Sequence, residues 1–538
     1  MSHKQLLFRS AARAKLLRGA TALADAVKIT LGPRSKSVLI AKKWGAPIVC
    51  NDGVTIAKEL ELEDLDEDLG VRTIRQAAER TGDAVGDGTT TSTLLAHAIY
   101  AEGVRNVEAG ASAVDIKRGL DRGLHAAVAA IQRISRPVAD HRERVQIATV
   151  SAHNDEQIGT LVAEAVERVG ADGVVSLEDA KGTETALEVV EGMSFDRGFL
   201  SPYFVTDPAR MECVLDQPLI LIHEPKITAM QPLVPVLEHV AQLGRPLLII
   251  AEDLETEALA TLVVNRVRGT VASVAVKAPG FGDRRKEILG DIAALTGGRV
   301  VSAELGQKLE NVAIADLGSA SRVVVDKDST AIIGGAGDKR AIADRVERLR
   351  HEILETKSDY DKEKLQERLA KLTGGVAVIR VGASTEAEAK RRKEAFEDAV
   401  SATKAAVAEG VVPGGGLALL RAIEAVRAEE ASCDGDERTG LKILARALEA
   451  PTRTIAENSG FDDGVVVERM RAGTGNQGFD AARGVYCDLV EAGIIDPTKV
   501  VRLALENAVS VAGVLLLSEA TMTEPPEPPR AAAAHLEA

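Results

Sequence analysis

The hydrophobic pattern of this chain changes from helical to strand-rich and back to helical, and this order limits how the chain can fold. Between 192 and 375, short β-branched runs bounded by Gly or Pro alternate with helices, which is typical of an α/β module. Helical spacing dominates both flanks, and we expect helices at 11–30, 65–85, 89–109 and 112–133 and again through 411–520. A chain that leaves a domain and later returns to it has a nested, multidomain α+β/α architecture.

Small or rigid residues stand at the four crossings between these regions. Pro137 follows the first helical block, Gly192 and Gly375 bound the α/β module, and Gly410 ends a long helix expected at 385–409. Connectors that end in such residues could act as paired hinges between domains. Each residue could equally do no more than end an element, so both interpretations stay open.

The composition is that of a folded chain with little attraction to nucleic acid. Of 538 residues, 45% are hydrophobic and 27% charged, so the chain can bury several cores, and its length suggests about three or four domains. A net charge of −15 without a long Lys/Arg block argues against contacts to a phosphate backbone. An aromatic content of 2% argues against base stacking, so we expect no nucleic-acid partner.

The sequence predicts neither export nor membrane insertion. We see no apolar run of the roughly 18 residues that span a bilayer, and Arg9 and Arg13 interrupt the region where a signal peptide has its apolar core. The four cysteines lie far apart, without the spacing of a zinc site: Cys50, Cys213, Cys433 and Cys487. A reduced, cytoplasmic location fits this pattern best.

One short motif has the chemistry of an anion site. Gly86-Asp87-Gly88-Thr89-Thr90-Thr91 precedes a predicted helix, so backbone N–H groups, three hydroxyls and the positive end of the helix dipole can face a phosphate. Asp87 would repel that anion unless a hard cation such as Mg²⁺ lay between them. The same residues would also make an ordinary helix N-cap, and the chain has no P-loop motif.

Other segments offer related chemistry. Thr30-Leu31-Gly32-Pro33 combines a hydroxyl with a glycine, and Asn51-Asp52-Gly53 places a carboxylate on a tight turn. Gly414-Gly415-Gly416 precedes a helix and would let a ligand approach the backbone closely. Asp398 lies midway along the helix expected at 385–409, where a lone carboxylate is most often simply solvated.

The helix expected at 256–268 is apolar around an unusually wide arc. Its apolar positions cover about 240°, whereas a one-sided amphipathic helix needs about 100°. Either this helix is buried on all sides, or one additional face meets an apolar partner.

Eight segments together resemble the bacterial group I chaperonins, the GroEL-like family. They are TLGP at 30–33, DGV at 52–54, GDGTTT at 86–91, EGMSFDRGFLSPYF at 191–204, PLLIIAEDLETEALATLVVN at 246–265, VKAPGFGDRRKEIL at 276–289, SDYDKEKLQERLAKLTGGVAVI at 358–379 and GIIDPTKV at 493–500. The resemblance extends from about residue 4 to 523.

This resemblance implies the GroEL-like nested fold. A mostly helical equatorial domain would comprise 1–136 and 410–523, and a small hinge-like intermediate domain 137–191 and 376–409. An α/β apical domain at 192–375 would bind substrate, and 524–538 would be a disordered tail.

The resemblance also implies an ATPase coupled to protein folding, with ATP, Mg²⁺ and K⁺ as cofactors. Asp87 would hold Mg²⁺, and the Thr30 backbone would help hold K⁺. The remaining nucleotide contacts would come from Leu31, Gly32, Pro33, Asn51, Gly88, Thr89, Thr90, Thr91, Gly415, Asp480, Ile494 and Asp496. Asp398 would position the attacking water, with Asp52 close by.

In such a protein the apical domain would capture non-native polypeptides on an apolar groove. The residues implied are Phe199, Tyr203, Phe204, Val234, Leu237, Leu259, Val263 and Val264. A GroES-like co-chaperonin would compete for this groove, and the chain would assemble as two stacked seven-fold rings.

Several positions depart from the usual family pattern. Asn51 stands where Lys is common, Asp480 where many members have Asn beside the adenine, and Ala408 where the residue is usually acidic or Gln. The Gly-Gly-Met-rich tail is absent. These departures motivate an alternative, a specialised paralogue that acts as a holdase or scaffold with weak ATPase. A metabolic phosphotransferase is a third possibility, for which no acceptor site stands out.

Overall fold

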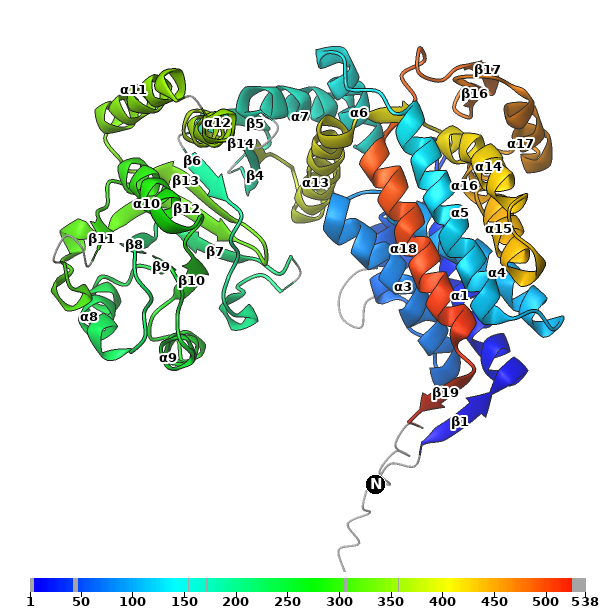
Figure 1. Cartoon of the computed structure of the whole chain (residues 1–538), viewed down its shortest axis with the longest axis horizontal. Helices are drawn as coiled ribbons and strands as arrows, with labels where there is room; N and C mark the ends of the chain where they lie inside the picture. Colours follow the sequence, from blue (N-terminus) through cyan, green and yellow to red (C-terminus); the bar gives the residue numbers. More distant parts are fainter. Residues whose placement is uncertain are drawn as a thin grey trace, which may run out of the picture. The chain divides into compact units, whose positions relative to one another are not determined.

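The computed structural model describes residues 4–524, except 42–46, 153, 171–172, 181, 191, 209, 303–306 and 357. The chain forms two compact units (Figure 1). The helical unit combines Met1–Ala163 with Glu394–Ala538, and the sheet unit is the single stretch Glu164–Lys393. The chain therefore leaves the helical unit and returns to it, as the hydrophobic pattern predicts. The tail expected to be disordered lies outside the described residues, apart from Glu524.

Long helices drawn from both stretches of the chain build the helical unit. They are α1 (Arg9–Lys28), α3 (Leu65–Val85), α4 (Thr89–Glu108), α5 (Ala113–Ile134), α14 (Leu417–Glu430), α15 (Gly435–Ala447), α16 (Ala450–Asn458), α17 (Asp463–Ala472) and α18 (Thr498–Leu517), with the shorter α2 (Gly53–Glu59) and α6 (His141–Ser151). One hydrophobic core joins the two stretches, because Leu95 and Ile99 of α4 are buried in the same cluster as Leu444 of α15 and Leu505 of α18. Both boundaries between the units fall within helices, α7 (Glu156–Val169) and α13 (Glu386–Glu409).

Helix α18 is long and apolar enough to cross a membrane by length and composition alone. In this structure 61% of the most apolar 18-residue stretch of α18 is buried, and the helix packs against α3, α4 and α5. The central helix of a folded core has the same composition as a membrane span, because both are surrounded by apolar groups. Figure 1 shows α18 running along these neighbours.

Short strand pairs close the helical unit at several points. β1 (Gln5–Phe8) pairs antiparallel with β19 (Ala520–Thr523), and β2 (Val38–Ile40) with β3 (Ile48–Cys50). β15 (Val411–Pro413) pairs with β18 (Ile495–Pro497), and β16 (Gln477–Asp480) with β17 (Val485–Asp488). The registers of the last two strand pairs fix the positions of the adjoining segments around 414–416, 480–484 and 494–496.

The sheet unit is organised around an eight-stranded sheet with the order β10-β9-β8-β12-β13-β6, in which β11 also pairs with β8 and β7 with β12. The strands are β6 (Gly192–Phe195), β7 (Cys213–Asp216), β8 (Leu219–His223), β9 (Leu247–Ala251), β10 (Ser273–Lys277), β11 (Val300–Val301), β12 (Gly318–Val325) and β13 (Thr330–Gly335). β8, β9, β10 and β11 are parallel, and β8 and β9 are buried along their whole length, as expected for strands covered on both faces. Helices α8 (Val234–Leu243), α9 (Thr256–Val267) and α10 (Gly282–Thr296) belong to this unit.

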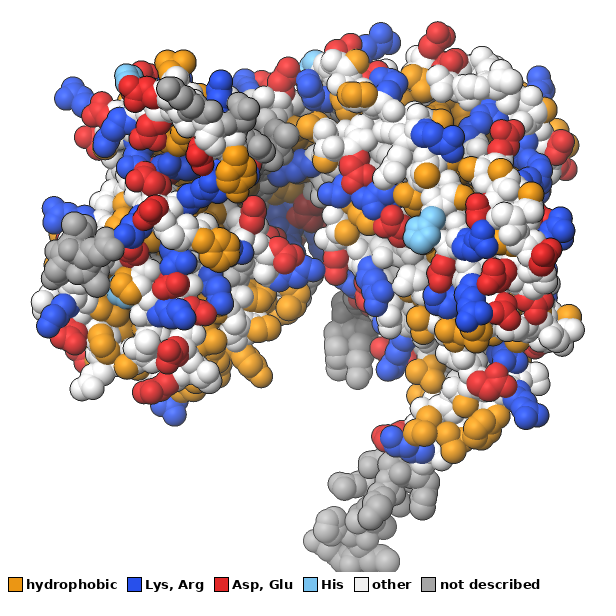
Figure 2. Space-filling model, viewed as in Figure 1, with side chains coloured by type: hydrophobic (Ala, Val, Ile, Leu, Met, Phe, Trp, Pro, Cys, Tyr) orange, Lys and Arg blue, Asp and Glu red, His pale blue; other side chains and the backbone are white. Residues whose placement is uncertain are grey.

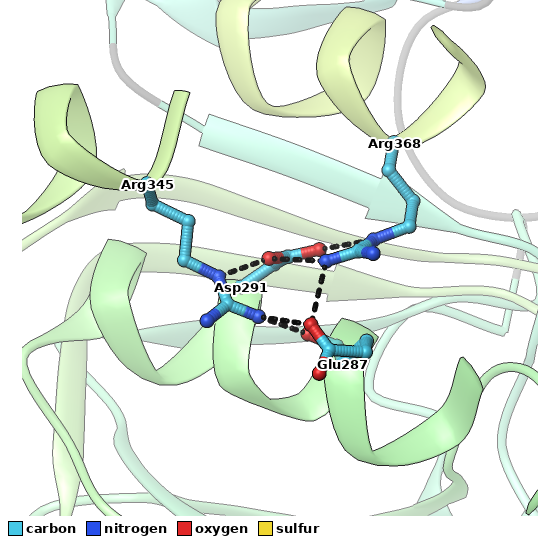
Figure 3. A network of polar contacts seen from close by, with 4 residues as sticks. All are labelled: Glu287, Asp291, Arg345 and Arg368. Carbon is cyan, nitrogen blue, oxygen red and sulfur yellow. Dashed lines mark hydrogen bonds and ion pairs between the residues drawn. The ribbon is translucent and has the colours of Figure 1, made fainter. Parts of the chain in front are cut away.

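A smaller sheet, with the order β4-β14-β5, lies in the same unit; its strands are β4 (Val174–Asp179), β5 (Ala186–Val190) and β14 (Val376–Val381). The charged pair α11 (Lys339–Glu355) and α12 (Asp359–Thr373) is tied to α10 by ion pairs (Figure 3). Asp291 on α10 is fully buried and accepts hydrogen bonds from Arg345 on α11 and, at 2.9 and 3.1 Å, from Arg368 on α12. Glu287 accepts from the same two guanidinium groups at 3.1 and 3.2 Å.

The hydrophobic pattern predicted the long elements closely. The helices expected at 65–85, 89–109 and 112–133 correspond to α3, α4 and α5, and the helix expected at 385–409 is α13. The prediction for 411–520 was incomplete, because four short strands interrupt the helices there. Strands of three or four residues are too short to show a two-residue period. β15 and β18 also pair across more than 80 residues, whereas β16 and β17 are neighbours in the sequence.

Candidate functional site

The turn between α3 and α4 holds Asp87 between two glycines in left-handed conformations, Gly86 at φ 68° and Gly88 at φ 78°. A side chain at Gly88 would collide with α18, because an added Cβ would lie 2.7 Å from the Val500 Cγ1. Asp87 Oδ1 accepts from the Gly88 N–H at 2.5 Å, and Oδ2 accepts from the Ser151 hydroxyl at 3.0 Å. Ser151 ends α6, and sequence reasoning missed it because nothing in its local pattern links it to Asp87.

Three threonines open α4 immediately after this turn. Thr89 and Thr90 are buried, and Thr91 is partly buried. The Thr90 Oγ1 lies 3.2 Å from the Thr30 Oγ1, so the first turn of α4 contacts the loop that follows α1. An added Cβ at Gly53 would lie 2.5 Å from the Thr90 Oγ1, so the start of α2 contacts it as well. The structure thus brings together three loops that the sequence singled out separately.

The loop Thr30–Pro33 is anchored from α16. The Asn458 side chain donates from Nδ2 to the carbonyl oxygens of Lys28 and Leu31, at 2.7 and 2.9 Å. Gly32 has φ 95°, Thr30 to Gly32 are partly buried, and Pro33 is exposed. Asn458 is a second residue that sequence reasoning missed, since it lies more than 400 residues from the loop it holds.

Asp52 has a clear local role as the N-cap of α2. Its carboxylate accepts from the N–H groups of Val54 and Thr55, at 3.2 and 2.8 Å. This short helix was not expected from the sequence, where the segment suggested only a tight turn. The cap fixes the direction of the Asp52 carboxylate, and the neighbouring Asn51 is partly exposed.

Asp398 has the most perturbed environment among these carboxyls. Burial raises the pKa of Asp398 well above its ordinary value, and the negative charges of Asp87 and Asp52 raise it further. Asp398 lies on the part of α13 that belongs to the helical unit, so α13, α2 and the α3–α4 turn direct carboxyls into one region. Such a cluster is unfavourable by itself and becomes favourable when a cation binds.

Among the described residues, no group of three or more His, Cys, Asp or Glu is arranged to hold a metal ion by itself. Mg²⁺ commonly binds through one or two carboxylates together with substrate phosphates and water. The single carboxylate of Asp87 beside a helix N-terminus fits that mode, in which the phosphates complete the coordination.

A second group of predicted residues surrounds the β15–β18 pair. The Gly414 N–H donates to the Ile494 carbonyl oxygen at 2.9 Å, and an added Cβ on Gly414 would lie 3.0 Å from the Asp496 Oδ1. Asp496 is partly exposed, yet burial of its carboxyl and the charge of Asp87 raise its pKa to about 7. Gly415 at φ 64° and Ile494 are partly buried beside it.

Asp480 is buried in the turn between β16 and β17. Its Oδ1 accepts from the N–H groups of Ala482 and Arg483 at 3.0 and 3.1 Å, and Arg483 forms an ion pair with it at 3.7 Å. The carboxylate thus stabilises the turn itself. An asparagine side-chain oxygen could accept the same backbone bonds, so this turn tolerates either residue.

The apolar residues singled out in the sheet unit divide into exposed and buried groups. Tyr203 is 72% exposed, Val264 45% and Val234 38%, while Phe199, Leu259 and Val263 are partly buried against the core. Phe204 and Leu237 were expected to line the groove, but they are buried at 0% and 7% exposure and belong to the core in this structure. Phe204 is the buried residue of the short helix Pro202–Phe204, which packs against α9 and β10. The sequence alone could not show which of the two neighbouring aromatic residues, Tyr203 or Phe204, points inward.

Helix α9 resolves the two alternatives left by its wide apolar arc. Ala258 and Leu262 are buried, whereas Val264 and Val267 are exposed at 45% and 72%. The helix therefore packs one face on the sheet and leaves a second apolar face open. Figure 2 shows hydrophobic side chains along the lower edge of the sheet unit, where Figure 1 places α8 and α9.

Comparison with known proteins identifies the family to which these features belong. Residues 23–526 match the TCP-1/cpn60 chaperonin family. The chain belongs to this family. It is also 67% identical, over 98% of both chains, to chaperonin GroEL 5 of Bradyrhizobium diazoefficiens.

Membership of the chaperonin family gives the function. The protein is an ATP-dependent protein-folding chaperonin, an ATPase whose reaction is coupled to folding, and it uses ATP with Mg²⁺. Chaperonins bind non-native polypeptides and form oligomeric rings. The sequence resemblance predicted this family and this activity.

Proposed function

We propose that this chaperonin hydrolyses ATP where the α3–α4 turn, the Thr30–Pro33 loop, the start of α2 and the middle of α13 meet. The observation that carries the proposal is the raised pKa of Asp398, which burial, Asp87 and Asp52 produce together. Phosphoryl transfer needs neutralised charge and an aligned nucleophile more than covalent help; Asp87 is suited to hold a charge-neutralising Mg²⁺, and Asp398 to align the nucleophile.

The phosphate side of the site has residues suited to a triphosphate with Mg²⁺. We assign Asp87 as the Mg²⁺ ligand, oriented by Ser151, and Gly88, Thr89, Thr90 and Thr91 as the residues that surround the phosphates. The positive end of α4 strengthens their binding. Bound Mg²⁺ supplies charge neutralisation at the phosphate oxygens.

The loops around this centre complete the nucleotide contacts. Thr30, Leu31, Gly32 and Pro33 line the nucleotide, and Asn51 lies close to Asp52. The backbone of Thr30 helps to hold K⁺, because a carbonyl oxygen is a suitable ligand for a hard cation. Gly415 and Asp496 contact the ribose, and Ile494 and Asp480 lie on the side of the base. The β15–β18 and β16–β17 registers support this assignment, because they fix these four residues on adjoining loops.

Asp398 and Asp52 are the catalytic carboxyls of the proposal. Asp398 accepts a hydrogen bond from the attacking water and so directs its lone pair at the terminal phosphate. The N-cap hydrogen bonds to α2 hold the Asp52 carboxylate in one orientation, and the negative charge of Asp52 favours cation binding in this region.

The exposed apolar face of the sheet unit is the proposed client site. Tyr203, Val234 and Val264 offer exposed area, Phe199, Leu259 and Val263 form its floor, and Phe204 and Leu237 support it from the core. Apolar contact is non-directional, so such a face accepts many sequences at about 25 cal/mol per Å². A GroES-like co-chaperonin would compete for the same face.

Assembly as two stacked seven-fold rings would multiply this site. Several weak patches around a ring raise the effective affinity for a long, unfolded chain without any new contact. We propose a division into equatorial (1–136, 410–523), intermediate (137–191, 376–409) and apical (192–375) domains, in which both boundaries between the two compact units fall inside the intermediate domain. We propose a cytoplasmic location, which the wide spacing of the four cysteines in the sequence supports.

Asp398→Ala tests the proposal directly. The variant should bind ATP with near wild-type affinity, and its hydrolysis rate should fall by a factor of about 10² or more, because the water loses its orienting acceptor. Nucleotide binding and single-turnover phosphate release measure the two effects. Glu424→Ala, an exposed carboxylate on α14, should change neither and serves as the control. Undiminished turnover in Asp398→Ala would overturn the assignment.

A further inference from the structure

Arg34 connects two loops of the nucleotide site that are 448 residues apart in the sequence. It directly follows Pro33, and its Nη2 donates to the Ala482 carbonyl oxygen at 3.0 Å in the turn between β16 and β17. Its Nη1 donates to the Ser459 carbonyl oxygen at 3.2 Å, just after α16. A planar guanidinium is suited to bridging two acceptors at once.

An aromatic ring lies beneath this bridge. The Arg34 Cζ is 5.8 Å from the centroid of the Phe461 ring, within the range of a cation–π contact. The same ring supports the β16–β17 turn, because an added Cβ at Gly484 would lie 2.8 Å from the Phe461 Cζ. Phe461 also packs edge-on against Phe479 of β16, with centroids 5.0 Å apart. Arg34 and Phe461 therefore hold the 480–484 turn from two sides.

The phosphate side of the site is anchored by a different residue. Asn458 holds the backbone at Lys28 and Leu31 through its own two hydrogen bonds, which do not involve Arg34. Loss of the Arg34 bridge should leave the Thr30–Pro33 loop attached to α16 and free the 480–484 turn. The carboxyls that act in hydrolysis lie on the α3–α4 turn, α2 and α13, which Arg34 does not contact through any of these bonds.

We propose that Arg34 is a positioning residue that sets the base-side turn 480–484 against the phosphate-side loop and so governs how tightly ATP and ADP are held. This inference rests on the proposed function, because that assignment places the two loops on opposite ends of the nucleotide. A residue that orders the binding surface equally in the ground state and the transition state changes KM and leaves kcat unchanged.

The test is the kinetics of Arg34→Ala in the full-length chaperonin. One lost bridge of ordinary hydrogen-bond strength should raise the KM for ATP and the inhibition constant of ADP by about 3- to 10-fold, with kcat within about twofold of wild type. Arg34→Lys, which keeps the charge and can bond one carbonyl at a time, should recover part of the loss. Lys36→Ala removes a cation from the same exposed loop and is the matched control.

Two further measurements separate positioning from a general loss of structure. Peptide-level hydrogen exchange should increase at 479–486, where the Gly484 N–H bonds to the Asp480 carbonyl, and stay unchanged at 28–33. Phe461→Leu should raise KM in the same way, and combining it with Arg34→Ala should add less than the sum of the two effects.

Unchanged KM in Arg34→Ala, or a kcat loss without a KM change, would overturn the inference. Failure of the proposed function has a different signature. If Asp87→Asn leaves ATP binding and hydrolysis intact in the wild-type background, the nucleotide lies elsewhere, whatever Arg34 does.

Discussion

At the scale of single residues, two carboxyls of the proposed ATP site, Asp398 and Asp496, lie in surroundings that disfavour their charge. Asp496 illustrates the consequence, because its pKa in the folded chain is about 7 and that of an exposed Asp is about 3.9. The folded state therefore retains a proton that the unfolded state releases between these pH values. Stability contributed by this group is present below about pH 4 and declines as pH rises toward 7.

Asp496→Asn should remove this decline while preserving the shape of the side chain. The difference in thermal midpoint between variant and wild type, without nucleotide, should move in favour of the variant as pH rises from 4.5 to 8. The measurement is the midpoint of both proteins across that range, with Glu424→Gln as the control, since its carboxyl is exposed. Parallel pH profiles for Asp496→Asn and wild type would contradict the prediction.

How much of the site the sequence predicted depends on where each residue's partners lie. Asp87 and its threonines form a contiguous motif, so their anion-binding chemistry is visible in the sequence. The sequence around Asp398 is that of an ordinary helix. Its raised pKa depends on burial in the folded chain and on the charges of Asp87 and Asp52, which are remote in sequence. The partners Ser151, Asn458 and Arg34 act through one or two long-range hydrogen bonds each, which leave no local pattern.

At the scale of elements, helix α10 combines apolar packing with a buried charge that pairs with two neighbouring helices. Asp291 is fully buried, and two arginines from α11 and α12 converge on it (Figure 3). The pairing explains how two helices as polar as α11 and α12 hold a fixed place, since each buries few apolar side chains. A buried charge pair specifies one arrangement because any other leaves a charge without its partner.

Asp291→Ala should destabilise the sheet unit by about 3–5 kcal/mol, because it leaves two guanidinium groups with a single remaining acceptor, Glu287. Glu347→Ala removes an exposed pair with Arg350 on the same α11 and should cost less than about 1 kcal/mol. Thermal unfolding, together with hydrogen exchange of α11 and α12, measures both. The prediction is wrong if the two variants unfold alike.

The long elements were predictable and the short ones were not, for a physical reason. Helices α3 to α5 have apolar residues at a regular spacing over twenty or more positions, which outweighs local exceptions. Strands such as β15 and β18 contain three residues each and form only because a partner more than 80 residues away supplies their hydrogen bonds. Pairing across such separations is set by tertiary packing.

At the scale of the whole molecule, the proposed client site and the proposed ATP site belong to different units of one chain. Tyr203, Val234 and Val264 lie in Glu164–Lys393, and the carboxyls of the proposed ATP site lie in the helical unit. A substitution on the apolar face should therefore impair capture without altering the basal ATPase. The sequence order predicted this division, because the helical pattern brackets the strand-rich one.

Val264→Ser should weaken capture of a denatured client and lower its refolding yield, while thermal stability stays close to wild type, because Val264 is 45% exposed. Phe204→Ala lies beside the same face but empties a fully buried position and should cost about 3–5 kcal/mol of stability. Client co-sedimentation, refolding assays and thermal unfolding distinguish the two. Normal capture by Val264→Ser would show that clients bind elsewhere.

The pairing of β1 with β19 has a consequence for biosynthesis. The sheet unit is one continuous stretch and is complete once residue 393 has left the ribosome. The helical unit cannot finish folding until almost the whole chain has been synthesised, because β1, which is made early, pairs with β19, which is made near the end. Asp87 and Thr30 likewise emerge long before Asp398 and Asp496. During translation there is thus an interval in which the exposed apolar face of the sheet unit, the proposed client site, exists before the proposed hydrolysis site is complete.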